Sequence, residues 1–299
     1  MKKILFYTES KWAFGTIHYG LCRELYKHGI YATVLDWELQ YTKEEFSLLI
    51  NTYDSFVTTP PFVLKLHYEY GVPLNKIIAV AHGQWDILLA KKNADFDFYP
   101  TLKSFVVISN ILKKKCEEWK ISVTPKIAET GIHFDLFYQK VPENLNIIGY
   151  GGAIETFNFW GEKIKRGNLV KETADDVGIQ LKTHNFYNFN CMPSYYSSID
   201  SLIMSSSEEA AGLPIMEAAA AGRLVMGTPV GYFEEHAPKG AGILLPLDSE
   251  NFKKELKNNI LYYRENSKEL TEKCKEIQQY AKDNYDWSKR INSWVELFS

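Results

Sequence analysis

The 299-residue chain lacks several features that would place it in well-defined classes of protein. It has no run of about 18 to 20 apolar residues, the length that a membrane-spanning helix needs. Its four cysteines lie far apart without a C-x-x-C pair, which argues against a disulfide framework and a structural zinc site. The net charge is only −3, and neither half of the chain has the basic excess of a nucleic-acid-binding protein. Internal repeats and low-complexity tracts are also missing.

These absences leave a cytoplasmic globular protein as the expectation. The first residues lead straight into an apolar strand rather than into a signal peptide, and 45% hydrophobic residues suffice for two cores. One basic run, Lys113–Lys115, lies beside apolar residues and could make a weak peripheral contact with anionic lipid. The neighbouring Glu117 and Glu118 favour a solvated helix face instead.

Short apolar runs alternate with helical spacing along the chain, which predicts an α/β protein with parallel sheets covered on both faces. The spacing at 17–27 predicts a helix, and the stretch 187–196 is aromatic-rich and resembles a loop. Strands are expected at 3–7, 32–35, 55–58, 76–81 and 104–108, and then at 145–150, 180–183 and 201–204.

The most informative segment is 205–222, where a strand runs through a small-residue loop into an alanine-rich helix. Pro214 is expected in the first helical turn, where its missing N–H has no cost. Glu209 therefore lies in the loop, and Glu217 lies about one turn into the helix. The two carboxylates are thus held by one loop-helix element.

The backbone amides of Gly212 and Leu213 are expected at the start of this helix. The positive end of the helix dipole favours a phosphate there, and the nearby carboxylates would accept hydrogen bonds from hydroxyl groups. Together these groups indicate a nucleotide-sugar site. An ordinary helix start with two solvated acids is the alternative that these residues alone leave open.

Here the chain resembles the retaining glycosyltransferases of the GT-B fold, in the family known as glycosyl transferases group 1. Their mark is a Glu-x7-Glu pair within E-G-F-G-L-x-x-x-E-A-M-A-x-G, and this chain has E-A-A-G-L-P-I-M-E-A-A-A-A-G at 209–222. Further family-like motifs follow in order: G-T-P-V-G at 227–231, G-A-G-I-L-L-P at 240–246 and Y-D-W-S at 285–288. The resemblance implies two Rossmann-like doubly wound domains that face each other across a cleft, with a C-terminal helix returning toward the first.

A polar stretch around Pro142 separates the two series of strands. We therefore expect an acceptor-binding domain at 1–142 and a nucleotide-sugar-binding domain at 143–282. The resemblance implies that residues 283–299 form the helix that packs back on the N-terminal domain.

The resemblance also implies two sites in the first domain. Gly15 lies in the expected loop 8–16, where the family has a pair of glycines that allow close backbone approach to a phosphate or an acceptor. A plain strand-to-helix turn is the alternative. His82 follows the strand 76–81 and resembles the family's histidine that faces the donor sugar, where it would hydrogen-bond hydroxyls or respond to developing charge. A structural histidine is the alternative.

The positive charge for the donor diphosphate is less regular than in the family. The family has an arginine soon after the first strand of the second domain, and this chain has no arginine there. Lys165 and Arg166, which precede an expected helix at 169–177, are the substitutes, and the sequence leaves open which of them reaches the phosphates. The nucleotide base is expected near 183–186, with a mobile aromatic loop as the alternative.

The implied reaction is retaining glycosyl transfer without a metal or a cofactor, from a nucleotide-diphosphate sugar to a glycan, lipid-linked or small-molecule acceptor. Glu217 would hold the ribose and Glu209 the sugar hydroxyls. UDP is favoured over GDP, although these residues do not distinguish the bases, and the oligomeric state stays open.

Other functions compete with this one. A non-catalytic nucleotide-sugar or glycan-binding protein fits the irregular phosphate site, and a GT-B epimerase or phosphorylase shares the fold. A nicotinamide oxidoreductase is suggested by Gly149-x-Gly151, but the fingerprint needs glycine or alanine where Ile154 stands.

Overall fold

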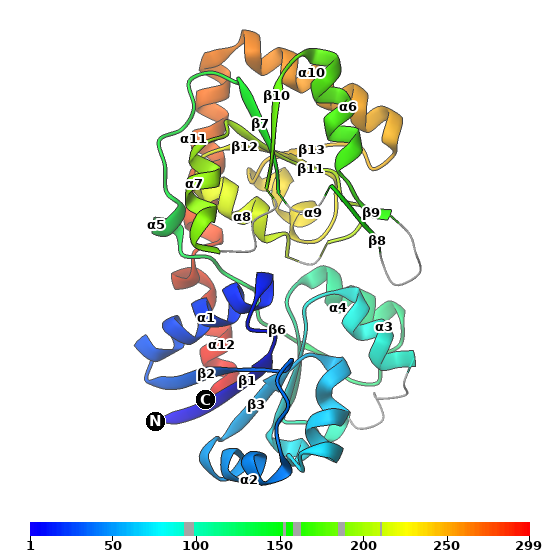
Figure 1. Ribbon diagram of the computed structural model, residues 1–299, viewed down its shortest axis with the longest axis vertical. Coiled ribbons are helices and arrows are strands. Elements are labelled where there is room, and N and C mark those ends of the chain that lie inside the picture. The colour runs from blue at the N-terminus through cyan, green and yellow to red at the C-terminus, as the bar shows by residue number, and fades with distance from the viewer. Residues whose placement is uncertain (93–98, 152–153, 158–162, 185–188, 210) are drawn as a thin grey trace. The chain divides into compact units, whose positions relative to one another are not determined.

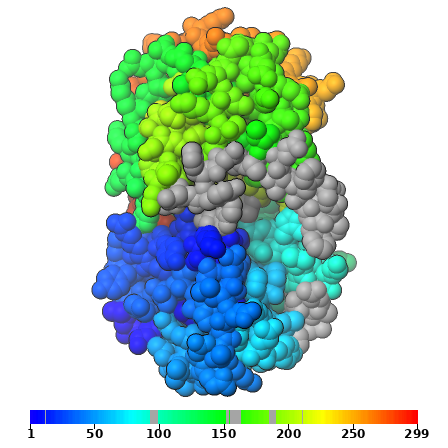
Figure 2. Space-filling view, viewed as in Figure 1, coloured from blue at the N-terminus to red at the C-terminus, as the bar shows by residue number. Residues whose placement is uncertain are grey.

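The computed structural model describes residues 1–92, 99–151, 154–157, 163–184, 189–209 and 211–299. The chain divides into two compact units. Unit 1 comprises Met1–Gly131 with Trp287–Ser299, and unit 2 comprises Ile132–Asp286. In the space-filling view, unit 1 is largely blue to cyan and unit 2 largely green to orange (Figure 2).

Unit 1 contains a parallel sheet in the order β2-β1-β3-β4-β5-β6. Its described strands are β1 (Lys2–Thr8), β2 (Ile30–Asp36), β3 (Ser55–Thr58), β4 (Ile77–Ala81), β5 (Ser104–Val107) and β6 (Lys126–Ile127). Its helices are α1 (Trp12–Lys27), α2 (Lys43–Thr52), α3 (Gln84–Lys92), α4 (Asn110–Glu118) and α12 (Trp287–Phe298), with short helical turns η1 (Pro60–Phe62), η2 (Lys65–Glu69) and η3 (Leu74–Lys76).

Helices cover both faces of this sheet, because successive strand residues point to opposite sides. Phe6 of β1 contacts His18 of α1 and Phe298 of α12, whereas Tyr7 contacts Phe46 of α2. α12 packs beside α1 (Figure 1). The side chain of Trp294 on α12 is fully buried, so this helix contributes to the core of unit 1.

Unit 2 contains a second parallel sheet in the order β10-β7-β11-β12-β13, and a separate antiparallel pair, β8 with β9. The described strands are β7 (Ile147–Gly151), β8 (Glu155–Phe157), β9 (Lys163–Arg166), β10 (Gln180–His184), β11 (Ser201–Met204), β12 (Leu224–Gly227) and β13 (Ile243–Leu244). The helices are α5 (Phe134–Phe137), α6 (Gly167–Val177), α7 (Met192–Ser197), α8 (Leu213–Ala220), α9 (Tyr232–His236), α10 (Ser249–Glu265) and α11 (Ser267–Asn284), with turns η5 (Phe189–Cys191) and η6 (Ala237–Lys239).

The predicted parallel α/β architecture is therefore confirmed, and three local expectations change. α1 begins at Trp12 rather than at residue 17, and α6 begins at Gly167 rather than at residue 169. The aromatic-rich stretch is not wholly a loop, because Met192–Ser197 form α7. The antiparallel pair β8 and β9 has no counterpart in the sequence prediction.

Surface features bear on the membrane hypothesis. In α4, Leu112 and Cys116 are buried, Lys114 is exposed, and Lys115 pairs with Glu118 at 2.8 Å. Among the residues that the structure describes, none of the helices combines the length and the apolar character needed to cross a membrane.

Candidate functional site

Four neighbouring strands of unit 2 end at one edge of the sheet. The parallel register pairs His184 of β10 with Gly151 of β7, and Met204 of β11 with Gly227 of β12. Ligands of open parallel sheets bind outside this carboxyl edge. The loop after β11 and the start of α8 lie at this edge, so the sheet positions Glu209 and the helix start together.

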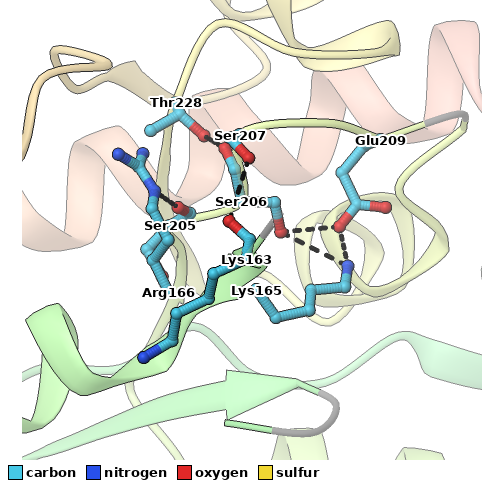
Figure 3. Close-up of polar contacts among 8 residues, drawn as sticks. All are labelled: Lys163, Lys165, Arg166, Ser205, Ser206, Ser207, Glu209 and Thr228. Atoms are coloured by element: carbon cyan, nitrogen blue, oxygen red, sulfur yellow. Dashed lines mark hydrogen bonds and ion pairs between the residues drawn. The ribbon is translucent and has the colours of Figure 1, made fainter. Parts of the chain in front are cut away.

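Glu209, Lys165 and Ser206 form one polar cluster in unit 2 (Figure 3). The Lys165 ammonium pairs directly with Oε1 of Glu209, and the Ser206 hydroxyl donates to the same oxygen at 2.7 Å. Lys165 Nζ also donates to Ser206 Oγ at 3.3 Å. The Lys165 and Glu209 side chains are only 23% and 16% exposed. This cluster joins two residues that the sequence singled out separately.

The charge of Lys165 is set by opposing influences. Burial lowers the pKa of its ammonium group to about 8, because desolvation disfavours the charged form. The carboxylate of Glu209 favours the charged form. Lys165 therefore carries most of a positive charge at neutral pH.

Ser206 was missed by the sequence analysis, since serines at strand ends are too common to mark a site.

Arg166 points away from this cluster (Figure 3). Its Nε donates to the carbonyl oxygen of Ser205 at 2.6 Å, and its Nη1 donates to that of Leu247 at 2.5 Å. Its guanidinium carbon lies 5.9 Å from the ring centre of Phe252 on α10. Arg166 thus ties the loop after β11 to the segment before α10. Of the two basic residues that the sequence left open, Lys165 is the one that reaches Glu209.

The start of α8 has an unusual backbone conformation. Gly212 precedes the helix with φ 64° and ψ 51°, the left-handed region that glycine adopts most easily. A Cβ atom there would meet nothing closer than 3.8 Å, so the backbone conformation rather than crowding explains this glycine. No side chain among the described residues caps the first turn, which begins at Leu213. Its dipole therefore favours an anion at this end.

Glu217 lies inside unit 2 on α8 and is only 3% exposed. The hydroxyl of Tyr196 on α7 donates a hydrogen bond to its Oε2 at 2.8 Å. Burial raises the pKa of this carboxyl to about 8, so it is largely protonated at neutral pH. A protonated carboxyl can donate one hydrogen bond and accept others, as a ribose diol requires. Tyr196 was missed because its stretch looked like a loop, although Pro193 is a helix-start signal there.

In unit 1, His82 directly follows β4 and is 5% exposed. Its backbone amide donates to Asp86 at 2.7 Å, and the amide of Gly83 donates to the same oxygen at 3.1 Å, so Asp86 fixes this turn. Burial lowers the pKa of the His82 imidazole to about 4. The ring is therefore neutral near pH 7 and is suited to hydrogen bonding rather than to titration.

The expected loop 8–16 is shorter than the sequence suggested, because Gly15 lies inside α1. Its amide already donates to the carbonyl oxygen of Lys11 at 2.9 Å. A Cβ atom at this position would lie 2.2 Å from the carbonyl oxygen of Ser10. The position of Gly15 in α1 corrects the expected loop, and the close contact with Ser10 accounts for a glycine here.

The glycines of the Gly149-x-Gly151 pattern also have packing roles. A Cβ atom at Gly149 would lie 2.4 Å from the side chain of Ile199, and one at Gly151 would lie 3.1 Å from that of Pro214. These contacts let β7 approach its neighbours closely, which accounts for the glycines without a nicotinamide cofactor.

The expected base pocket is only partly described. His184 ends β10, is 5% exposed and packs against Tyr195 with ring centroids 4.8 Å apart. Asn185 and Phe186 lie outside the described residues.

Two doubly wound α/β units with parallel sheets are the architecture of the GT-B fold, and solved structures of similar fold agree with this assignment. Residues 132–266 match the model of the family described as "Glycosyl transferases group 1". The matched stretch includes Lys165, Glu209 and Glu217. The expected likeness to glycosyl transferases group 1 and to the GT-B fold is thereby confirmed.

Three solved structures illustrate the likeness. The Anabaena protein Alr3699/HepE, in complex with UDP and glucose, is 15% identical, with 99% of this chain and 98% of that chain covered and a TM-score of 0.69. Sucrose-phosphate synthase from Thermosynechococcus elongatus is 13% identical, with 100% and 98% covered and a TM-score of 0.69. A glycosyltransferase from Rickettsia africae is 14% identical, with 99% and 98% covered and a TM-score of 0.70. Identities this low establish the fold alone. A search of curated proteins returns no match.

Proposed function

We propose that the protein is a retaining glycosyltransferase that moves a hexose-type sugar from a nucleotide-diphosphate sugar to a hydroxyl group of a glycan, lipid-linked or small-molecule acceptor. The observation that carries this proposal is the part-buried Lys165–Ser206–Glu209 cluster, whose Glu209 lies four residues before Leu213, the first residue of the uncapped helix α8. Both features fall within the stretch that matches the group 1 glycosyltransferases.

In this proposal, different residues of unit 2 bind different parts of the donor. Lys165 and the amides of Gly212 and Leu213 bind the diphosphate, where positive charge stabilises the leaving group as the glycosidic bond breaks. The buried Glu217 carboxyl hydrogen-bonds the ribose hydroxyls. Glu209 accepts hydrogen bonds from hydroxyls of the transferred sugar. In unit 1, the neutral His82 imidazole supplies a hydrogen bond to the sugar.

The donor is UDP-linked in this proposal, in line with the UDP that the Anabaena protein binds. No metal takes part, because Lys165 and the helix start supply the positive charge. We place the protein in the cytoplasm, where the four thiols of Cys22, Cys116, Cys191 and Cys274 stay reduced; all four are free in the structure.

A thermal-shift panel of UDP, GDP, ADP and their sugars tests the donor. At a concentration 100 times its Kd, a ligand adds about 2.7 kcal/mol, which raises Tm by roughly 5 °C or more for a unit of this size. We expect UDP and a UDP-sugar to give the largest shift. A panel without any shift would contradict the proposal.

Product analysis separates transfer from related activities. Release of UDP in the presence of an acceptor, with a product that keeps the donor's anomeric configuration by NMR, is the expected result. A free epimerised sugar nucleotide would indicate an epimerase instead.

A non-catalytic nucleotide-sugar-binding protein is the second candidate. Arg166 donates hydrogen bonds to main-chain carbonyl groups, which leaves one cation fewer for the diphosphate. This observation favours a binding function without catalysis. Binding without turnover, against a broad panel of acceptors, would select this function.

A further inference from the structure

A row of aromatic side chains lies at the carboxyl edge of the sheet in unit 1, and the proposed donor site does not use it. Phe14 comes from the start of α1, Trp37 directly follows β2, and Phe62 ends η1. The rings of Trp37 and Phe62 stack with centroids 4.2 Å apart and planes 10° from parallel. Phe14 meets Trp37 at 5.9 Å. We call these three residues the aromatic shelf.

The aromatic shelf is only part-buried, whereas the rings beneath it belong to the core. Tyr7 and Phe46 have no exposed surface. Tyr7 meets Phe62 edge-on at 6.1 Å and Phe46 at 5.8 Å, so the core holds the shelf in place. Rigid, partly exposed aromatic rings at a ligand-binding edge offer a flat apolar surface on which the C–H face of a sugar ring packs.

The charged groups beside the aromatic shelf are mainly acidic. The segments that follow β1 and β2 carry the carboxylates of Glu9, Asp36 and Glu38 against the ammonium group of Lys11, which pairs with Glu38 at 2.8 Å. Burial, and then the carboxylates of Glu38 and Asp36, raise the pKa of Glu9. Asp36 accepts a hydrogen bond from the Ser10 hydroxyl. The net negative charge of these groups repels phosphate, whereas their carboxylates can accept hydrogen bonds from hydroxyl groups.

Phe14 connects the aromatic shelf to His82. The two rings meet edge-on with centroids 4.9 Å apart. Nδ1 of His82 is buried and has no hydrogen-bond partner among the described residues, and the same holds for the hydroxyl of Thr8. Thr8 is the register partner of Asp36 at the end of β1. Because buried polar atoms normally have partners, these atoms indicate where a ligand's hydroxyl groups would bind.

We propose that the aromatic shelf binds the acceptor of the transfer reaction, and that this acceptor is an uncharged carbohydrate rather than a phosphate-bearing carrier. A sugar ring packs on the face of Trp37 that is turned away from Phe62, and its hydroxyls bind Asp36. A hydroxyl directed past Phe14 lies next to His82. The role as acceptor rests on the proposed function, but the binding of the sugar is measurable without catalysis.

Isothermal titration of the full chain tests this inference with maltotriose, cellotriose and chitotriose as neutral probes and glucose 6-phosphate as the charged probe. At least one neutral sugar should bind, and more tightly than glucose 6-phosphate. Trp37→Ala should weaken that binding about tenfold, and Trp37→Phe should retain most of it. Tyr26→Ala is the matched control, because Tyr26 is 65% exposed on α1 outside the shelf. Unchanged binding by Trp37→Ala, tighter glucose 6-phosphate, or no binding of any neutral sugar would overturn the inference.

A charge variant tests the acidic surrounding. Glu9→Gln combined with Glu38→Gln removes two carboxylates and releases Lys11 from its ion pair. We expect the affinity for glucose 6-phosphate to rise at least about threefold, while that for the neutral sugar stays within about twofold. A parallel titration with UDP separates the two proposals: retained UDP binding without sugar binding rejects the shelf alone. Retained sugar binding without UDP binding rejects the proposed donor reaction and supports the shelf.

Discussion

Replacing Glu217 with glutamine should change how the stability of unit 2 depends on pH. The carboxyl has a pKa of about 8 in the folded protein, against 4.5 for the unperturbed group. Below pH 4.5 the Glu217 carboxyl is protonated in both the folded and the unfolded state, so folding does not bury a charge. Between pH 4.5 and 8 the unfolded chain loses the proton while the folded chain keeps it. Stability therefore falls as the pH rises through this range.

The size of the effect follows from this difference in pKa. At pH 7 the unfolded state gains about 3 kcal/mol from ionisation of Glu217, and the folded state gains little. Glutamine stays neutral at every pH and still accepts the hydrogen bond from Tyr196. Relative to the native protein, Glu217→Gln should therefore gain about 3 kcal/mol between pH 4.5 and 7, or roughly 6 °C or more in Tm.

Calorimetric unfolding of the native chain and the variant at pH 5, 6, 7 and 8 measures this difference. Only the difference between the two proteins is used, because Asp86 and the buried histidines also contribute to each curve. Glu265→Gln, the same substitution on the exposed surface of α10, is the matched control. Parallel curves for Glu217→Gln would refute the reasoning, since they would mean that the carboxyl is as well solvated folded as unfolded.

Three other predictions concern the cluster beside Glu209. Lys165→Ala should weaken UDP binding about tenfold by titration calorimetry, whereas Lys163→Ala should not, because Lys163 points away from Glu209 in Figure 3. Arg166→Ala should lower the free energy of unfolding in urea by about 2 kcal/mol with little change in UDP affinity; a larger loss of UDP affinity than in Lys165→Ala would reverse the two roles. Glu209→Gln should slow UDP release in a turnover assay about 100-fold while UDP still binds, and full turnover would exclude Glu209 from the site.

The strands were predictable because parallel strands buried on both faces form continuous apolar runs. Ile4, Leu5 and Phe6 of β1 are an example, with no more than 1% exposure each. The position of Glu209 before a helix start was predictable for a similar local reason, since Gly212 and Pro214 signal the start of α8 within a few residues.

The direction of a side chain was not predictable where tertiary contacts decide it. Lys165 and Arg166 are neighbours on β9, a short strand whose pairing with β8 is interrupted by a bulge. One reaches Glu209 and the other reaches main-chain carbonyls more than 35 residues away in sequence. The contact between Gly15 and the Ser10 carbonyl was not predictable for the same reason, because it forms only when the chain folds back.

In the proposed function, Lys165 serves as the cation for the diphosphate together with the start of α8. Lys165 and Glu209 are both largely buried and form an ion pair, so neither charge is left unpaired. In this proposal, a diphosphate at the start of α8 would compete with Glu209 for the ammonium group. Once Lys165 turns to the phosphates, Glu209 is left with its Ser206 hydrogen bond and oxygens that can accept from sugar hydroxyls. The proposed roles of the two residues therefore depend on each other, which is why Glu209→Gln should impair transfer without preventing the nucleotide from binding.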